Sequence, residues 1–501
     1  MKLFARFTAL VLLAGGQVFA DRPDILMIAV DDLRPMLGCY GDPRAKTPNI
    51  DRLASRGVVF DRAYCQYAKC GASRLSLMTG LRPDAFGAFG HNNKVVEAFR
   101  KRRPDAVSMA RWLKDQGYHT RGLGKIYHDG WDVESDWSEP PMPGREKEML
   151  EIYDRSNPEG PSIIADRWLC PVMQSPDVPD EHFFAGRMTV EAIRILRERP
   201  EGQKPLFLAV GYRRPHLPFV APRRYSDLHQ PNRAWLAKNP EPPKGSPVMA
   251  WFNGAGYVGG ARKAGLTMPN PPNREQAQLW NGYEMRSYMG VPNQGLLNVR
   301  LQLELLQAYA ACVSYVDAQI GKMLDELESS GRLKNMVIVL WSDHGWQLGE
   351  YSAWSKMTNF EVATRVPLII AAPGIKPART QNLAELVDLY PTLCELAGVD
   401  APTHVEGESL APVLRQPGKA ITTTALSQHA RYNEKFMGRA LRTDRHRFVA
   451  WFEKKSGRIV ERELYDHETD PLETRNLAND PDQAKQVAQL EQQLLVAFGR
   501  Q

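Results

Sequence analysis

Cysteine is scarce in this chain. Only six occur among 501 residues, and no two of them form a CxxC pair. Zinc ribbons and dense disulfide frameworks are built on closely spaced cysteine pairs, so neither is expected here. Cys312 and Cys394 lie on apolar helical patterns and are expected to be plain core residues. The four that need separate explanations are Cys39, Cys65, Cys70 and Cys170.

The chain also lacks a long basic run and any interleaving of basic with aromatic residues. Its net charge is only +6, from 64 basic and 58 acidic residues. A nucleic-acid-binding surface usually appears as a clustered basic patch, so no nucleic-acid partner is expected. Internal repeats and low-complexity tracts are absent as well, and 43% of the residues are hydrophobic, which is ordinary globular composition.

Extended apolar runs are confined to the first twenty residues. Lys2 and Arg6 flank the start of the segment, Leu10–Ala14 forms its apolar centre, and Val18-Phe19-Ala20 resembles a small-residue cleavage site. This pattern predicts a secretory signal peptide over residues 1–20, and hence a periplasmic or secreted protein. No later run approaches the roughly 18 apolar residues that span a bilayer, so no stable membrane association is expected.

The rest of the chain alternates short apolar runs with amphipathic stretches. Such alternation predicts an α/β fold, with a mostly parallel sheet covered by helices on both faces. The predicted strands are 24–30, 58–60, 118–124, 205–212, 335–345 and 366–374, and the predicted helices are 47–57, 105–117, 181–199, 300–331 and 383–398. Asp105 is the expected N-cap of its helix.

Two stretches depart from this rhythm and predict the domain organisation. Residues 213–295 are rich in Pro, Gly, Trp and Asn, which is typical of loops that build substrate pockets. They are expected to be an insertion in a main domain over 21–418. Residues 419–501 predict a smaller C-terminal α+β subdomain with an antiparallel sheet, turns at Ser456-Gly457 and Asp470-Pro471, and a last helix at about 481–498.

Acidic residues follow two of the buried strands. The first strand runs into Asp31-Asp32 and the strand at 335 runs into Asp343-His344. Ligands in open α/β sheets bind beyond the carboxyl ends of strands, and three carboxylates gathered there repel one another unless a cation is bound. Carboxylate oxygens suit Ca²⁺ or Mg²⁺, whereas the histidine alone would favour a transition metal. The sequence therefore predicts a metal site at this edge.

Basic side chains beside other strand ends predict an anion site at the same edge. Lysine binds oxyanions as a point charge, and histidine moves protons at neutral pH. Each of these residues taken singly is as compatible with a surface charge or a structural histidine, so the prediction rests on their shared position. They are Lys125, His128, His216 and Lys356.

Cys70 opens the stretch "KCGASRLSLMTG". A buried thiol at a helix start is one interpretation, and the precursor of a nucleophile is the other. Ser73 does not suggest a hydrolase triad, because no GxSxG elbow surrounds it. The motif Cys70-Gly71-Ala72-Ser73-Arg74 followed by "MTG" instead resembles the signature of the sulfatase family.

The resemblance extends over most of the chain. The stretches "AVDDLRPMLGCYGD", "TPNIDRLASRGVVFDRAYCQ", "WSKMTNFEVATRVPLI" and "ELYDHETDPLETRNLA" are similar to successive sulfatase blocks. Other marks are those of the iduronate-2-sulfatase branch, namely "DDLRPMLGCYG", "GKIYH", "AVGYRRPHLPF" and "SDHGWQLGE". This resemblance implies an alkaline-phosphatase-like fold and the hydrolysis of sulfate esters.

The resemblance also implies roles for individual residues. Cys70 matches the residue that a maturation enzyme, formylglycine-generating or radical, oxidises to formylglycine, whose hydrate attacks the sulfate. Arg74 matches the residue that holds this nucleophile, His128 its partner, and His216 the acid that assists the leaving group. The Ca²⁺ ligands match Asp31, Asp32, Asp343, His344 and the modified Cys70, and the substrate-binding residues are expected to be Lys125, His216, Lys356 and Trp346.

The expected substrate is a sulfated carbohydrate with 2-O-sulfated uronic acid residues. Two alternatives stay open: a phosphodiesterase or phosphonate hydrolase of the same superfamily, and a carbohydrate-binding homologue whose Cys70 is never converted. Two departures from the family pattern bear on this choice. Ala72 stands where the motif usually has proline, and Cys170 matches a disulfide cysteine of the branch without a partner in 131–169.

Overall fold

The computed structural model describes most of the chain between residues 22 and 499. The described ranges are 22–87, 89, 93–128, 130–143, 151–152, 162–163, 170–199, 203–253 and 273–499. The predicted signal peptide over 1–20 lies outside them. Within these ranges, no helix combines the length and the apolar character that a membrane crossing requires.

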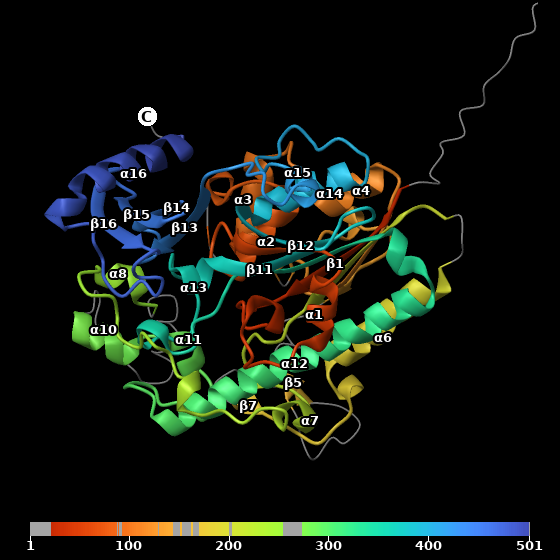
Figure 1. The fold of residues 1–501 in the computed structure, drawn as a ribbon, viewed down its shortest axis with the longest axis horizontal. Helices are drawn as coiled ribbons and strands as arrows, with labels where there is room; N and C mark the ends of the chain where they lie inside the picture. Colours follow the sequence, from red (N-terminus) through yellow and green to blue (C-terminus); the bar gives the residue numbers. More distant parts are fainter. Residues whose placement is uncertain are drawn as a thin grey trace, which may run out of the picture.

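An eight-stranded sheet forms the centre of the molecule (Figure 1), in the order β12-β2-β11-β10-β1-β8-β3-β4. Every neighbouring pair is parallel except the two that involve β11, which runs opposite to the rest. The strands are β1 (Asp24–Val30), β2 (Val58–Tyr64), β3 (His119–Gly124), β4 (Met142–Pro143), β8 (Leu206–Tyr212), β10 (Met336–Ser342), β11 (Arg365–Ala371) and β12 (Ala378–Glu385). The predicted mostly parallel α/β sheet is confirmed.

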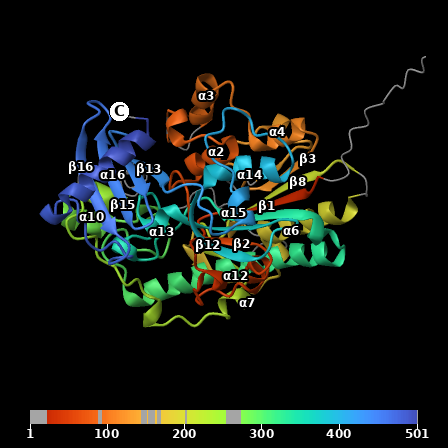
Figure 2. The same cartoon turned by 45° about the horizontal axis from the view of Figure 1, so that its top comes forward.

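Helices cover both faces of this sheet because its strands are apolar on both sides. Along β1, Leu26 and Ile28 join one core cluster while Ile25 and Met27 join the other, which is the two-residue period of a strand. Figures 1 and 2 show one layer of helices on each side. One layer holds α1 (Pro48–Ala54), α6 (Phe184–Glu198) and α12 (Val299–Ser329), and the other holds α2 (Cys70–Thr79), α4 (Met109–Asp115) and α14 (Leu389–Leu396).

A second, antiparallel sheet lies beside the main one near the C-terminus (Figure 1), with the helix α16 (Ala484–Ala497) packed on it. Its strands, in spatial order, are β13 (Ala425–Arg431), β14 (Phe436–Arg442), β15 (His446–Glu453) and β16 (Ile459–Asp466). The predicted antiparallel sheet is thus confirmed, and the domain boundary after residue 418 stays a prediction.

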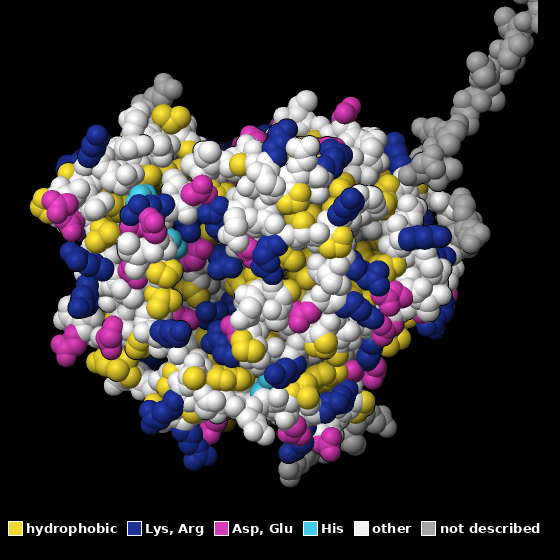
Figure 3. All heavy atoms as spheres, viewed as in Figure 1, with side chains coloured by type: hydrophobic (Ala, Val, Ile, Leu, Met, Phe, Trp, Pro, Cys, Tyr) yellow, Lys and Arg dark blue, Asp and Glu magenta, His cyan; other side chains and the backbone are white. Residues whose placement is uncertain are grey.

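The two sheets meet around a charged hollow of about 590 Å³. Arg62 and Asp61 of β2, Arg365 of β11, Arg442 of β14 and Glu361 of α13 (Glu361–Thr364) line it together. The same mixing of signs holds for the face drawn in Figure 3, where Lys and Arg side chains lie interspersed with Asp and Glu. On this face no broad area is basic alone, so non-specific binding of polyanions is not favoured there.

Two local predictions were wrong. The stretch predicted as helix from 383 begins as the end of β12, and the helix α14 starts only at Leu389. The sequence does not indicate β12, because this edge strand has exposed polar residues among its buried ones and so lacks a continuous apolar run. The second error concerns a cap: α4 is capped by Ser108, whose hydroxyl accepts from the Arg111 amide, and not by Asp105.

Short elements form the described part of the predicted insertion. They are β9 (Phe219–Val220), α7 (Arg223–Ser226), α8 (Val248–Trp251), α10 (Arg274–Trp280) and α11 (Tyr283–Arg286). All six cysteines are free thiols, and Cys312 and Cys394 lie in the core as expected. Cys170, for which no partner was found in 131–169, is buried in the main core.

Candidate active site at the carboxyl edge of the sheet

The residues that follow four neighbouring strands, β10, β1, β8 and β3, lie at one edge of the sheet. β1 ends before Asp31 and β10 ends before Asp343, and these two strands are paired in parallel register. The turn after β1 places Asp32 at φ 60°, a left-handed conformation that aspartate tolerates better than most residues. Its amide then donates to Oδ1 of Asp343, over 3.2 Å, which joins the two strand ends. The predicted convergence of these carboxylates is therefore present.

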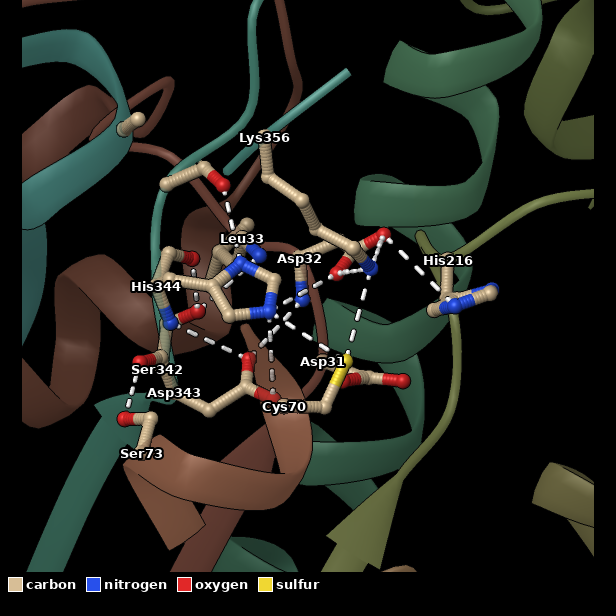
Figure 4. A network of polar contacts seen from close by, with 12 residues as sticks. Asp31, Asp32, Leu33, Cys70, Ser73, His216, Ser342, Asp343, His344 and Lys356 are labelled. Atoms are coloured by element: carbon tan, nitrogen blue, oxygen red, sulfur yellow. Dashed lines mark hydrogen bonds and ion pairs between the residues drawn. The ribbon is translucent and has the colours of Figure 1, made fainter. Parts of the chain in front are cut away.

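Cys70 begins the helix α2, directly after the loop that leaves β2. Its Sγ lies 3.2 Å from Nε2 of His344 and 3.4 Å from Nζ of Lys356, as Figure 4 shows. Burial raises the pKa of the Cys70 thiol to about 11. An unmodified Cys70 is therefore protonated at neutral pH and a weak nucleophile, because only the thiolate attacks efficiently.

Arg74, one turn further along α2, ties the helix to both acidic strand ends. Its Nε donates to Oδ2 of Asp343 over 2.9 Å and its Nη2 to Oδ1 of Asp31 over 3.2 Å. Two further bonds go to the carbonyls of Lys125 and Ile126. The side chain is fully buried, and removing it would take the arginine partner from the buried carboxylate of Asp343 and one of two cations from that of Asp31. Arg74 thereby fixes the position of Cys70 relative to the strand ends.

The side chains at this edge fit a divalent cation. Ligand atoms of Asp31, Cys70, Asp343 and His344 all lie within 4.8 Å of one another, and all four residues are buried. Nδ1 of His344 donates to the carbonyl of Gly345 over 3.0 Å, so Nε2 keeps its lone pair toward the carboxylates. Asp32 belongs to an overlapping group that shares Asp31 and Cys70. Together these residues offer three carboxylates and an imidazole, the oxygen-rich kind of donor set that Ca²⁺ accepts.

Two buried lysines pair with two of the carboxylates. Nζ of Lys125 donates to Asp31, and Nζ of Lys356 lies 2.6 and 2.9 Å from the two oxygens of Asp32. Although burial favours the neutral acid, the Lys125 and Arg74 charges hold the pKa of Asp31 well below its usual range. Burial dominates at Asp32, whose pKa is raised despite Lys356. Both predicted lysines thus lie at the carboxylate cluster.

The two predicted histidines lie at the margins of the cluster. Nδ1 of His216 donates to the carbonyl of Leu217 over 2.7 Å, and its Nε2 is 4.0 Å from Asp32. Burial and the Lys356 charge lower the pKa of His216 well below its usual value. His128 packs edge-on against Trp131, with ring centroids 5.3 Å apart. Burial and the Lys125 charge lower the pKa of His128 to about 2. Both rings are therefore neutral in this structure.

Sequence reasoning missed one acidic residue of the site, whereas the one aromatic residue that it named lies beside Lys356. Glu284, on α11, brings Oε1 to 3.8 Å from Nε2 of His216, and nothing in its Pro- and Gly-rich surroundings indicated it. Trp346 is fully buried, with Nζ of Lys356 5.2 Å from its ring centre. The Trp346 ring packs against the Lys356 ammonium, and a direct contact between Trp346 and the substrate stays a prediction.

Comparison with known proteins identifies the family. The sulfatase family model matches residues 23–399, and a second model, N-sulphoglucosamine sulphohydrolase, C-terminal, matches residues 349–498. The chain is 32% identical to human iduronate 2-sulfatase, with 92% of each chain covered. It is 31% identical to a sulfatase of Formosa agariphila, over 92% of this chain and 83% of that protein.

Solved structures of about one-fifth identity share the fold. A 2-O GAG sulfatase superposes with a TM-score of 0.68 at 22% identity, covering 95% of this chain and 92% of that one. The phosphonate monoester hydrolase of Agrobacterium radiobacter gives a TM-score of 0.71 at 21% identity, over 95% and 96%. The expected alkaline-phosphatase-like architecture is thereby confirmed. The family model and the full-length relatives together show that this chain belongs to the sulfatase family of sulfuric ester hydrolases.

Proposed function

We propose that the protein is an exported, calcium-dependent sulfatase that removes 2-O-sulfate groups from uronic acid residues of a carbohydrate. The observation that carries this proposal is the position of Cys70, which begins α2 among buried carboxylates and two lysines. Relatives named iduronate 2-sulfatase, 32% and 33% identical over more than nine-tenths of the chain, supply the substrate class.

The charge balance of the site supports an anionic substrate. Asp31, Asp32 and Asp343 are matched by Lys125, Lys356 and Arg74, so these six side chains are neutral together. A divalent cation added to them would leave an excess of positive charge in a buried setting. Such an excess attracts a sulfate ester more strongly than it would in water, because the surroundings screen it less.

The proposed chemistry divides between groups added to the chain and its own side chains. Formylglycine derived from Cys70 supplies the nucleophile, and Ca²⁺ supplies positive charge beside it. Lys125 and Lys356 bind sulfate oxygens, and Arg74 holds the helix start in place. Because Nδ1 of His216 already donates to the Leu217 carbonyl, Nε2 is the atom that would protonate the departing sugar oxygen, and it can do so only after the ring has taken up a second proton.

Two measurements test this function. Mass spectrometry of the peptide across Cys70, from protein made by a host with a maturation enzyme, is expected to show aldehyde in place of thiol. The converted protein is expected to release sulfate from 4-methylumbelliferyl sulfate and from a 2-O-sulfated uronide. Cys70→Ala should abolish this release, and full activity in that variant would overturn the proposal.

Phosphonate ester hydrolysis is the second candidate. The fold shared with two phosphonate monoester hydrolases, at TM-scores of 0.71 and 0.67, favours it at the level of architecture. Parallel assays of the converted protein on an aryl sulfate and a phenyl phosphonate ester separate the two. A larger kcat/KM on the phosphonate ester would favour the second candidate.

We propose export because residues 1–20 have the pattern of a secretory signal peptide. Cleavage after Ala20 would leave Asp21 as the first residue. Mass spectrometry of the protein recovered outside the cytoplasm measures that terminus directly, and an intact Met1 there would contradict cleavage.

A further inference from the structure

A small cavity of about 210 Å³ is lined in part by residues that adjoin the candidate site along the chain. Lys69 and Met357, which line it, are the chain neighbours of Cys70 and Lys356. Asn253 lines it too, and its amide donates to the Lys356 carbonyl over 2.8 Å. Pockets for drug-sized ligands measure about 300–1,000 Å³, so this one suits a single monosaccharide-sized group attached to the reacting sulfate.

Aromatic side chains form much of its wall. Tyr67 stacks on Phe89, with ring centroids 5.1 Å apart, and lies 4.6 Å from the ring of His429. Phe252 and Tyr432 also belong to this aromatic part of the lining. Flat apolar surfaces with a few polar groups are what small-molecule pockets use to hold a ring and fix its orientation.

One buried polar atom of the wall is left for a ligand. His429, on β13, is 4% exposed, and within the described part of the chain its Nδ1 has no hydrogen-bond partner. Buried polar atoms are nearly always bonded to something, so an orphan on a residue that lines a cavity points to a group that the cavity accepts. A sugar hydroxyl supplies such a partner.

The charges of the cavity favour an anion. Its acid, Glu434, is already satisfied: Oε1 accepts from the Phe89 amide over 3.1 Å, and Oε2 lies 3.2 Å from Nζ of Lys454. Arg431 donates to backbone carbonyls, so no carboxylate neutralises it in these contacts. Nζ of Lys69 donates to the Phe89 carbonyl over 2.7 Å, which uses one of its three N–H groups.

We infer that this cavity, lined by Tyr67, Lys69, Phe89, Phe252 and His429, binds the sugar ring that carries the sulfate, and that Lys69 contacts a carboxylate on that ring. The inference rests on the proposed function and deepens it, because it makes Lys69 the residue that selects acidic over neutral sugars. A lysine that contacts a carboxylate gains a charge-assisted bond that an ester of the same sugar cannot replace.

A pair of substrates that differ only in this charge tests the inference. Methyl iduronoside 2-sulfate and its carboxyl methyl ester are assayed on the same converted sample, so that incomplete conversion of Cys70 cancels in the ratio of their kcat/KM values. The wild type is expected to favour the free acid by about 10- to 100-fold, mostly through KM. Lys69→Met should bring the ratio close to one, and Lys69→Arg should keep most of it.

Lys376→Met is the matched control, because Lys376 is an exposed lysine in the loop between β11 and β12. It should keep the wild-type ratio. A wild-type ratio near one, or an unchanged ratio in Lys69→Met, would overturn the role of Lys69 while sulfate release continues. If the wild type, with conversion of Cys70 verified, released sulfate from neither sugar nor 4-methylumbelliferyl sulfate, the proposed function itself would be overturned.

Discussion

Lys356 and Asp32 form a buried ion pair, with Nζ 2.6 Å from Oδ1, and the same ammonium lies 3.4 Å from the sulfur of Cys70. Lys356→Met should therefore remove a sulfate ligand and leave Asp32 without a cation. We expect at least a roughly 100-fold loss of kcat/KM on 4-methylumbelliferyl sulfate and a loss of about 3–5 kcal/mol in the free energy of unfolding. Activity assays and urea denaturation measure the two effects. Lys376→Met serves as control, and near-wild-type activity in Lys356→Met would contradict the role.

Chelation of calcium should destabilise the protein. An ion bound only by the folded state adds about 2.7 kcal/mol of stability at one hundred times its Kd. We expect the Tm measured by calorimetry to fall with EGTA and to recover with Ca²⁺. Asp343→Asn should weaken this response, because it removes one carboxylate of the cluster. Asp444→Asn, on a largely exposed side chain, should leave it unchanged, and a calcium-independent Tm in the wild type would contradict the predicted site.

Ala72→Pro should increase the conversion of Cys70 without disturbing the fold. Ala72 lies in the first turn of α2, where the amide has no partner within the helix, so proline costs no helical hydrogen bond. The residue before it is Gly71, which has no Cβ to clash with the ring of a following proline. The fraction of aldehyde at Cys70, measured by mass spectrometry in one host, should rise above that of the wild type and of Ala72→Ser. An equal or lower fraction would mean that alanine is no obstacle to maturation.

Stability should fall as the pH rises through the titration of Asp317. This carboxyl, on α12, accepts from the amides of Asn49 and Ile50 at the start of α1, and burial raises its pKa to about 6. A folded pKa above the unfolded value of 3.8 adds stability at low pH that is lost between about pH 4 and pH 7. The contribution is up to about 3 kcal/mol. Denaturation of Asp317→Asn should show a flatter pH profile, whereas Asp325→Asn, an exposed position on the same helix, should follow the wild type.

The meeting of the carboxylates was predictable, because it follows from the parallel direction of the strands. Parallel strands end at one edge, so residues that directly follow them, such as Asp31 and Asp343, must meet there. Lys356 precedes β11, and it reaches this edge because β11 runs antiparallel to its neighbours, a reversal that the sequence did not indicate. The site of Cys70 needed its motif, since a thiol at a helix start indicates nothing by itself.

Other parts had no periodic signal to follow. Glu284 and His429 reach the site from the loop-rich insertion and from the C-terminal sheet, and only the packing of these segments on the main sheet brings them close. The strand β12 was not predicted for a different reason. It lies at the edge of the sheet, and its exposed polar side chains interrupt the apolar pattern of a buried strand. Tertiary contacts, which local sequence does not record, decide both cases.

The reversed direction of β11 has a further consequence for how the site opens. The segment between Ser342 and Arg365 leaves the sheet and returns to it at the same edge, because β10 and β11 are antiparallel neighbours. It carries Asp343 and His344 near its start and Lys356 further along. A segment held at both ends in this way tends to fluctuate as one unit, with one free energy of local unfolding. Displacement of this one segment would therefore move the predicted metal ligands and the predicted sulfate ligand together.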